Sequence, residues 1–268
     1  MEDKLDANNW KLLDNQVGGH KDSIFVLESG LIAKPCLKTE VNFYTTLYNQ
    51  YKEYQLIKHI PKYYGTTVIT QDNVEKECVV LENLLKNYSH PCIIDIKIGT
   101  RLYGEAASEE KKQRMEYQAQ STTSRETGMR ICGLKVVDPQ SNTSFKAGKE
   151  LGRSLSASTI SEGFKPFFIN QDKVLINKSI LNQFKSKISN LIEVLKVEEY
   201  RLYSSSVLLI YDGNFAFTEV KERTEFLTDV KLIDFAHSHF CRGEGPDEGA
   251  VFGLKNLLDI IESYIRLH

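Results

Sequence analysis

The stretch HPCIIDIKIGTRLYG, residues 90–104, sets two opposite charges inside an apolar run. Side chains alternate between the two faces of a strand, so Asp95 and Lys97 share one face and the isoleucines around them share the other. A buried charge without a partner is costly, and such residues are therefore paired, exposed or functional. The stretch predicts either an edge strand with a neighbouring ion pair or a strand that delivers a carboxylate and an ammonium into a cleft.

The composition is that of a globular protein from a reducing compartment. With 268 residues, 41% of them hydrophobic, the chain can bury a substantial core as one large or two modest domains. No apolar run approaches the length of a membrane-spanning helix, and the acidic start MEDKLDANNW lacks the layout of a signal peptide. The five cysteines are widely spaced, which argues against a disulfide framework and a cysteine-rich zinc site. We expect a cytoplasmic or nuclear protein that has no membrane partner.

The charge is unevenly distributed along the chain. The net charge is −2, yet residues 97–165 hold 12 Lys and Arg against 8 Asp and Glu, which is +4 and leaves −6 for the remainder. A local basic segment in a mildly acidic protein fits a discrete anionic ligand better than bulk nucleic acid. The alternative is an ordinary solvated helix face.

The pattern of elements predicts two lobes, at residues 1–85 and 86–268. The first lobe combines strand-like runs with one helical stripe of apolar and aromatic residues. We expect its strands at 27–34, 63–70 and 78–84, and its helix at 40–57.

In the second lobe, Ser108 is a suitable N-cap for a helix, and the Asp212-Gly213 pair between two apolar runs predicts a β-hairpin over SSSVLLIYDGNFAF. Residues 141–153 read as a polar connection. We expect further strands at 130–137 and 228–237 and helices at 108–125, 158–169, 177–199 and 248–267.

Two other charged residues call for a reason. Lys34 ends the first strand-like run, and Glu40 on the following helix could steady it, as a Glu steadies the nucleotide-binding Lys of kinase-like sites. Asp234 lies within the apolar run VKLIDFAH. Magnesium in phosphoryl transfer is held by one or two carboxylates plus phosphate oxygens, which makes Asp234 the best-placed metal ligand. The alternatives are a solvated lysine and a structural, hydrogen-bonded aspartate.

The helix that begins near Ser108 carries a row of donors. Lys111, Arg114 and Gln118 stand at positions i, i+3 and i+7 and therefore share one face. Such a row suits a ligand with several phosphates, because each contact is charge-assisted. The alternative is the exposed face of an amphipathic helix.

Absent motifs narrow the class of enzyme. The chain has no Gly-x-x-x-x-Gly-Lys-Ser/Thr loop and no His-Arg-Asp or Asp-Phe-Gly triplet, which disfavours a Walker-type site and a eukaryotic protein kinase. His237-x-His239 lacks a third ligand in the sequence and is a weak metal motif.

Three segments resemble the inositol polyphosphate kinase family. PCIIDIKIG matches the family's Pro-x-x-x-Asp-x-Lys-x-Gly signature, and SSSVLLIYDG and LIDFAH match its Ser-Leu-Leu and Ile-Asp-Phe segments in the family's order. The chain looks most like the inositol hexakisphosphate kinases, through QVGGH (16–20), ASEEKKQR (107–114), GMRICGLKV (128–136) and YSSSVLLIYDG (203–213).

The resemblance implies an α+β, two-lobed fold of the ATP-grasp and protein-kinase-like type. A helical inositol-phosphate-binding insertion is expected at about residues 100–170. The implied activity uses ATP and Mg²⁺ to phosphorylate inositol hexakisphosphate on an existing phosphate, which yields a diphosphoinositol. We expect an inositol polyphosphate as the partner, no nucleic acid, and a monomer.

The resemblance also implies a role for each matched residue. Lys97 would touch the accepting group and the transferring phosphate, and Asp95 would contact the ribose and the substrate region. On the nucleotide side, Glu82 and Leu84 would bind adenine through their main chain. The other implied contacts are Lys34 and Glu40 for ATP, Ser206 near the phosphates, Asp234 for the metal, and Lys111, Arg114, Gln118 and His237 for the substrate.

The chain departs from the family's pattern in two places. The family's Ser-Leu-Leu reads Ser206-Val207-Leu208 here, a conservative change that leaves the expected fold and ATP binding in place. The segment between Asp138 and Phe164 is short relative to larger relatives, so the walls of the substrate pocket can differ and the choice of substrate stays open. A multikinase or trisphosphate kinase acting on free hydroxyls is the nearest alternative. An inactive inositol-phosphate scaffold is a further alternative, but it predicts the loss of charged site residues that this chain retains.

Overall fold

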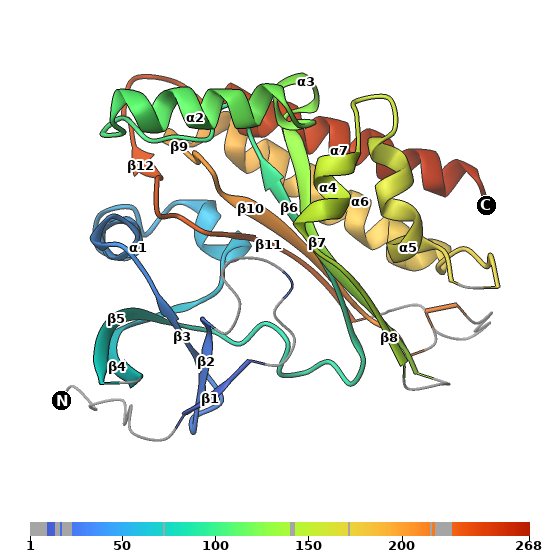
Figure 1. Ribbon diagram of the computed structural model, residues 1–268, viewed down its shortest axis with the longest axis horizontal. Helices are drawn as coiled ribbons and strands as arrows, with labels where there is room; N and C mark the ends of the chain where they lie inside the picture. The colour runs from blue at the N-terminus through green and yellow to red at the C-terminus, as the bar shows by residue number, and fades with distance from the viewer. Residues whose placement is uncertain are drawn as a thin grey trace.

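The computed structural model describes residues 10–13, 17, 23–71, 73–139, 143–170, 172–214, 216–217 and 227–268. Its strands form a small and a large antiparallel sheet, each with five strands within the described residues, and a separate two-stranded ribbon (Figure 1). The small sheet has the order β1-β2-β3-β5-β4, and the large sheet has the order β11-β10-β6-β7-β8.

The small sheet and its helices come from the first part of the chain. The elements are β1 (Trp10–Leu12), β2 (Phe25–Leu27), β3 (Ile32–Pro35), α1 (Lys38–Gln50), the 3₁₀ helix η1 (Gln55–His59), β4 (Tyr63–Gln71) and β5 (Val74–Leu81).

The large sheet and its helices follow. The strands are β6 (Pro91–Ile98), β7 (Met129–Asp138), β8 (Thr143–Ala147), β10 (Ser206–Asp212) and β11 (Thr228–Ile233), and the ribbon pairs β9 (Tyr200–Arg201) with β12 (His239–Phe240). The helices are α2 (Glu109–Gln120), α3 (Ser124–Thr127), α4 (Lys149–Ser154), η2 (Ile160–Phe164), α5 (Lys165–Phe168), α6 (Lys178–Val197) and α7 (Glu248–Arg266).

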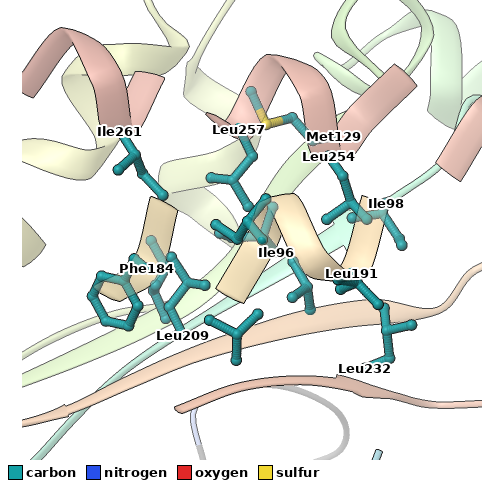
Figure 2. Packing of buried hydrophobic residues seen from close by; sticks show 14 of the residues in the cluster. Ile96, Ile98, Met129, Phe184, Leu191, Leu209, Leu232, Leu254, Leu257 and Ile261 are labelled. Atoms are coloured by element: carbon teal, nitrogen blue, oxygen red, sulfur yellow. The ribbon is translucent and has the colours of Figure 1, made fainter. Parts of the chain in front are cut away.

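Helices α6 and α7 bury one face of the large sheet. Each carries apolar residues at helical spacing and begins at a side-chain cap, Asn177 for α6 and Asp247 for α7. Figure 2 shows Ile96 of β6 and Leu209 of β10 packed beneath Phe184 of α6 and neighbouring helix residues. The apolar face of β6 thus packs into the core. The opposite face, which carries Asp95 and Lys97, points toward the small sheet.

Most of the predicted strands and long helices are confirmed. The expected strand at 130–137 is β7, and the expected helices at 177–199 and 248–267 are α6 and α7, within two residues at each end. These elements have strong periodicity over many residues, and their apolar faces all join one core.

Several predicted elements are interrupted. The expected strand at 27–34 is two strands joined by a turn with Gly30 at φ 79°. The expected helix at 40–57 ends at Gln50, before η1. The helix predicted over 108–125 ends at Gln120, where Ser and Thr hydroxyls take up main-chain carbonyls, as in the 2.7 Å bond from Thr122 Oγ1 to the carbonyl of Gln118.

Two further segments differ from expectation. The expected helix at 158–169 is the short pair η2 and α5, and the expected polar connection at 141–153 contains β8 and α4. The residues of β8 are mostly exposed and show no apolar alternation, so their sequence pattern does not predict a strand. The strand forms because these residues pair with the edge of β7.

The predicted hairpin around Asp212-Gly213 is wrong. Strand β10 pairs with β6 on one side and with β11 on the other, so its partner lies beyond the apolar run NFAF. Ala216 and Phe217 of that run lie in a turn, and the Ala216 carbonyl accepts the Asn177 N–H at the start of α6, 2.7 Å away. The run supports the α6 cap instead of forming a strand.

Strand β11 also stops earlier than predicted. It ends at Ile233, and Asp234 follows in the left-handed region at φ 66°.

None of the helices in the described part of the chain combines the length and apolarity needed to span a bilayer.

Candidate active site

A cavity of about 680 Å³ lies between the two sheets. Ile32 and Lys34 of β3 line it from the small sheet, and Asp95 and Lys97 of β6 line it from the large sheet. Further wall residues come from the start of α1 and from three connecting segments, residues 82–85 after β5, residues 203–204 before β10 and residues around Asp234 after β11. The charged face of β6 therefore lines a cleft. Of the two interpretations of the sequence, the strand that brings Asp95 and Lys97 into a cleft is confirmed, and the edge strand with a neighbouring ion pair is not.

Part of the cavity wall is apolar. Ile93, Leu208 and Ile233 contribute from the large sheet, and Ile32 and Leu81 contribute from the small sheet. Apolar walls on both sides of a slot suit a flat aromatic group such as a nucleotide base.

The segment after β5 offers main-chain groups next to Leu81 of this apolar wall. The Glu82 N–H donates to the Lys62 carbonyl at 2.9 Å, so the sheet already uses this donor. Within the described residues, the Leu84 N–H has no hydrogen-bond partner, and Leu84 lines the cavity. The Leu84 N–H and the Glu82 carbonyl are therefore the groups that can recognise a base edge.

In the same cavity, a three-residue ion-pair network joins the two sheets. Lys34 Nζ lies 2.8 Å from Glu40 Oε1 and 2.5 Å from Asp234 Oδ1. Glu40 is almost fully buried, and its Oε1 also accepts the Phe235 N–H at 3.1 Å. The order of the chain explains the geometry, because Lys34 ends β3, Glu40 follows in the first turn of α1, and Asp234 comes directly after β11.

Lys34 and Asp234 of the network are both charged at neutral pH. Burial alone would lower the pKa of Lys34, but the carboxylates of Asp234 and Glu40 outweigh it and raise this pKa. Burial alone would raise the pKa of Asp234, but Lys34 and then Lys97 outweigh it and lower this pKa. The cavity therefore holds an ammonium and a carboxylate side by side, both charged.

Asp95 and Lys97 stand next to this network. Asp95 is 3% exposed, and its Oδ1 has no partner with hydrogen-bond geometry among the described residues. Burial, followed by the Asp234 carboxylate, raises the pKa of Asp95 to about 6. Lys97 Nζ donates to the Ser204 carbonyl at 2.5 Å.

Ser206 lies opposite Lys97 and Ile233 in the large sheet, but it does not line the cavity. Its side chain is almost fully buried, and its hydroxyl has no geometric hydrogen-bond partner among the described residues. Ser206 is thus a buried neighbour of Lys97 within the sheet and does not form part of the cavity surface.

Helix α2 brings one of its predicted donors to the cleft. Lys111 Nζ lies 3.3 Å from Nε2 of His237, which lines the cavity. Burial and the ammonium groups of Lys111 and Lys97 lower the pKa of His237, so this ring is neutral at pH 7. Arg114 is exposed and Gln118 half-buried on the same helix, and neither lines the cavity.

Arg130 is a candidate that the sequence reasoning missed. It lies directly opposite Lys97 in the β6–β7 register, so both side chains share the cleft-facing side of the sheet. It is 9% exposed and does not itself line the cavity, and its Nη1 has no hydrogen-bond partner among the described residues. The signal was present in GMRICGLKV, where a charge again interrupts an apolar strand, as Asp95 and Lys97 do in β6.

The described residues of the cavity offer few ligands for a metal ion. The described residues contain no group of three or more His, Cys, Asp or Glu side chains that could hold a metal ion. The Asp234 carboxylate in the cavity fits a hard cation that takes its remaining ligands from phosphate oxygens and water.

Comparison with known proteins agrees with this geometry. Residues 78–262 match the family model described as inositol polyphosphate kinase. The chain is 32% identical to the inositol polyphosphate multikinase of Schizosaccharomyces pombe, over 92% of this chain and 95% of that protein. It is 36% identical to inositol hexakisphosphate kinase 3 of Mus musculus over 68% of this chain, but spans about half, 50%, of that relative.

Solved structures give the same result. The inositol phosphate multikinase from S. cerevisiae in complex with ADP and Mn²⁺ superposes with a TM-score of 0.74 at 30% identity, over 88% of this chain and 99% of that one. A second inositol phosphate multikinase structure superposes with a TM-score of 0.66 at 26% identity, over 84% of this chain and 98% of that one. The α+β, kinase-like fold expected from the sequence is confirmed, and the chain belongs to the inositol polyphosphate kinase family.

Proposed function

We propose that this protein transfers the terminal phosphoryl group of ATP to inositol hexakisphosphate, with Mg²⁺ as the metal. Residues 1–85 would form the lobe that grips the nucleotide phosphates, and residues 86–268 would supply the catalytic strands and the acceptor site. The observation that carries the proposal is the convergence of Lys34, Asp234 and Lys97 in one cavity, with Lys111 at its edge.

The nucleotide would lie with its base against the apolar wall of the cavity. The Glu82 carbonyl and the Leu84 N–H would bond the adenine edge, and Lys34 would hold the phosphates while Glu40 holds Lys34. Asp95 would meet the ribose and the acceptor region. The S. cerevisiae multikinase that superposes on this chain is itself a complex with ADP and Mn²⁺.

Asp234 would hold the metal ion, together with phosphate oxygens. When bound, Mg²⁺ neutralises charge on the phosphates that flank the bond to be broken. The lowered pKa of Asp234 keeps its carboxylate ionised for this role through the neutral range.

The transfer itself would depend on Lys97. An oxygen of the acceptor forms a bond to the γ-phosphorus while the bond from that phosphorus to the β–γ bridging oxygen breaks, and ADP leaves. Lys97 would neutralise the charge that the transferring group carries. Lys111, Arg130 and His237 would hold the acceptor's other phosphates, with Arg114 and Gln118 placed further along α2.

A second candidate function is the phosphorylation of free hydroxyls on less phosphorylated inositols. A hydroxyl must lose a proton during transfer, whereas a phosphate oxygen is already ionised. Asp95 has an unpartnered Oδ1 and a pKa raised to about 6, properties that suit a proton acceptor near neutral pH. The match to a multikinase over most of both chains also favours this candidate.

The deciding experiment offers Mg-ATP and one inositol phosphate at a time, from trisphosphate to hexakisphosphate, and separates the products by charge. The proposal expects a product with one phosphate more than the hexakisphosphate. Transfer to a trisphosphate alone would overturn the acceptor assignment and leave the kinase assignment standing. Tight inositol phosphate binding without transfer to any acceptor would instead indicate a non-catalytic sensor.

A further inference from the structure

Four aromatic rings form a continuous stack between α1 and the segment that follows β11. Phe43 of α1 lies between Phe235 and Phe240, with ring centroids 4.6 and 5.0 Å apart and ring planes inclined by 14° and 11°. Tyr51, just past the end of α1, stacks on the other side of Phe240 at 4.4 Å and 11°. Rings from the two lobes therefore alternate in one column, which we name the Phe43 stack (Phe235, Phe43, Phe240 and Tyr51).

Polar contacts tie the same two segments together. Thr39 Oγ1 donates to the Ala236 carbonyl at 2.6 Å, and the Phe235 N–H donates to Glu40 Oε1 at 3.1 Å. Phe43 and Phe235 are both at most 2% exposed, so the centre of the stack excludes water. Helix α1 lies between β3 and β4 of the small sheet in sequence, yet its first turn is bound to the segment after β11.

The joined segments carry the charged groups of the cavity. Asp234 and His237 belong to the segment after β11, and Glu40 lies one turn before Phe43 on α1. Lys34 contacts Glu40 and Asp234 simultaneously, so its position depends on the distance between these two carboxylates. A change in how α1 sits on the large lobe would change that distance directly.

We propose that the Phe43 stack is a positioning unit that holds Glu40, and through it Lys34, in register with Asp234. The placement of α1 is then set by packing between the lobes, and the nucleotide-phosphate grip needs no movement of this helix to assemble. This inference rests on the proposed nucleotide site.

Phe240 is the best position for a test. It is only partly buried, and it contacts both Phe43 and Tyr51, so its loss opens the stack without emptying the core. Phe240→Leu removes the ring, and Phe240→Tyr retains it. Phe184→Leu is the matched control, because Phe184 is a fully buried ring of α6 packed against Phe167 and Phe168, outside the stack.

Four quantities are measured for each variant: the dissociation constant of Mg-ADP by calorimetry, the KM for Mg-ATP, the Tm, and amide hydrogen exchange over residues 38–50 without nucleotide. Phe240→Leu should weaken Mg-ADP about tenfold, since two stacked contacts are lost, and should speed exchange in α1. Phe240→Tyr should stay near the wild type. Phe184→Leu should lower the Tm with the Mg-ADP affinity unchanged.

A double-mutant cycle separates positioning from general destabilisation. If the stack acts through Glu40, Phe240→Leu should weaken Mg-ADP binding much less in a Glu40→Gln protein than in the wild type. Phe184→Leu combined with Glu40→Gln should be additive. Full additivity for Phe240→Leu, or unchanged affinity and exchange in the single variant, would overturn the positioning role.

These results are distinguishable from a failure of the proposed function. A wild-type protein that binds Mg-ADP but phosphorylates no inositol phosphate would overturn the function, while the binding cycle would still decide the positioning role. A wild-type protein without measurable Mg-ADP binding would overturn both.

Discussion

At the scale of single residues, the cleft-facing side of β6 concentrates the chemistry. Lys97 shares its cavity with Lys34, Asp95 and Asp234, and its ammonium is held by a main-chain carbonyl. Asp95 lies beside it with a carboxylate oxygen that no described residue satisfies. A fully satisfied structural ion pair would leave no such oxygen, so the residue-scale geometry favours function over stability.

Lys97→Ala should lower kcat by about 10²- to 10³-fold, because a charged donor to the transferring group is lost. Initial rates with Mg-ATP and the preferred inositol phosphate measure the effect, and circular dichroism checks the fold. Lys112→Ala is the control, since Lys112 pairs with Glu109 on α2 and does not line the cavity. A Lys97→Ala protein that is folded and fully active would refute the proposed mechanism.

Asp95→Asn should stabilise the protein at neutral pH while impairing its activity. Folding raises the pKa of Asp95 from 3.8 to about 6, so the folded state binds more protons than the unfolded state between these values. The carboxyl therefore costs stability as the pH rises through this window, by about 3 kcal/mol above it.

Thermal unfolding at pH 4.5 and pH 7.5 measures the difference. The gain in Tm of Asp95→Asn over the wild type should be larger at pH 7.5, and Asp259→Asn on the exposed side of α7 should show no such pH dependence. An equal gain at both pH values would contradict the linkage.

At the scale of elements, close helix–strand packing fixes the large sheet beneath the cavity. Gly253 of α7 lies against Gly128, just before β7, and a Cβ at Gly253 would come within 2.0 Å of the Gly128 carbonyl oxygen. The Gly99 N–H at the end of β6 donates to the same carbonyl at 2.7 Å. The contact thus couples α7 to the strand ends that carry Lys97 and Arg130.

Gly253→Ala should destabilise the protein, although alanine is the better helix former by about 1 kcal/mol. The backbone of residue 128 must move to admit the new methyl group, and this cost outweighs the helix propensity. Denaturant unfolding measures the change against Lys255→Ala, an exposed position of the same helix. Stabilisation by Gly253→Ala would show that the contact can relax freely.

At the scale of the whole molecule, the two sheets are joined through charged and aromatic contacts across the cavity. Lys34 forms an ion pair with Asp234, 200 positions later in the sequence, and the Phe43 stack holds α1 against the segment after β11. Ligands that contact both walls of the cavity should therefore stabilise the entire fold.

Mg-ADP should raise the Tm, because a ligand at 100 times its Kd adds about 2.7 kcal/mol to the stability of the folded state. Removal of the metal with a chelator should abolish most of the rise, and Asp234→Asn should make the remaining shift independent of Mg²⁺. Differential scanning calorimetry measures all three. A rise that persists in full with the chelator would contradict metal binding at Asp234.

The local features of the fold could be predicted from local patterns. The alternation of β6, the helical stripes of α6 and α7 and the cap at Ser108 depend on neighbouring residues, and the structure confirms them. The hairpin failed for the complementary reason, because the true partner of β10 is a strand that follows later in the chain.

The sequence by itself determined that Asp95 and Lys97 share one face of β6, since the period of a strand places them together whatever surrounds them, whereas the structure showed that this face lines a cavity. It also determined the family, through motifs spread along the chain. Only the tertiary structure decided that Arg130 stands beside Lys97, that Lys111 but not Arg114 contacts His237, and that α1 is packed on the large lobe. These arrangements depend on strand register and on contacts between distant segments, whose energies arise only when the whole chain is folded.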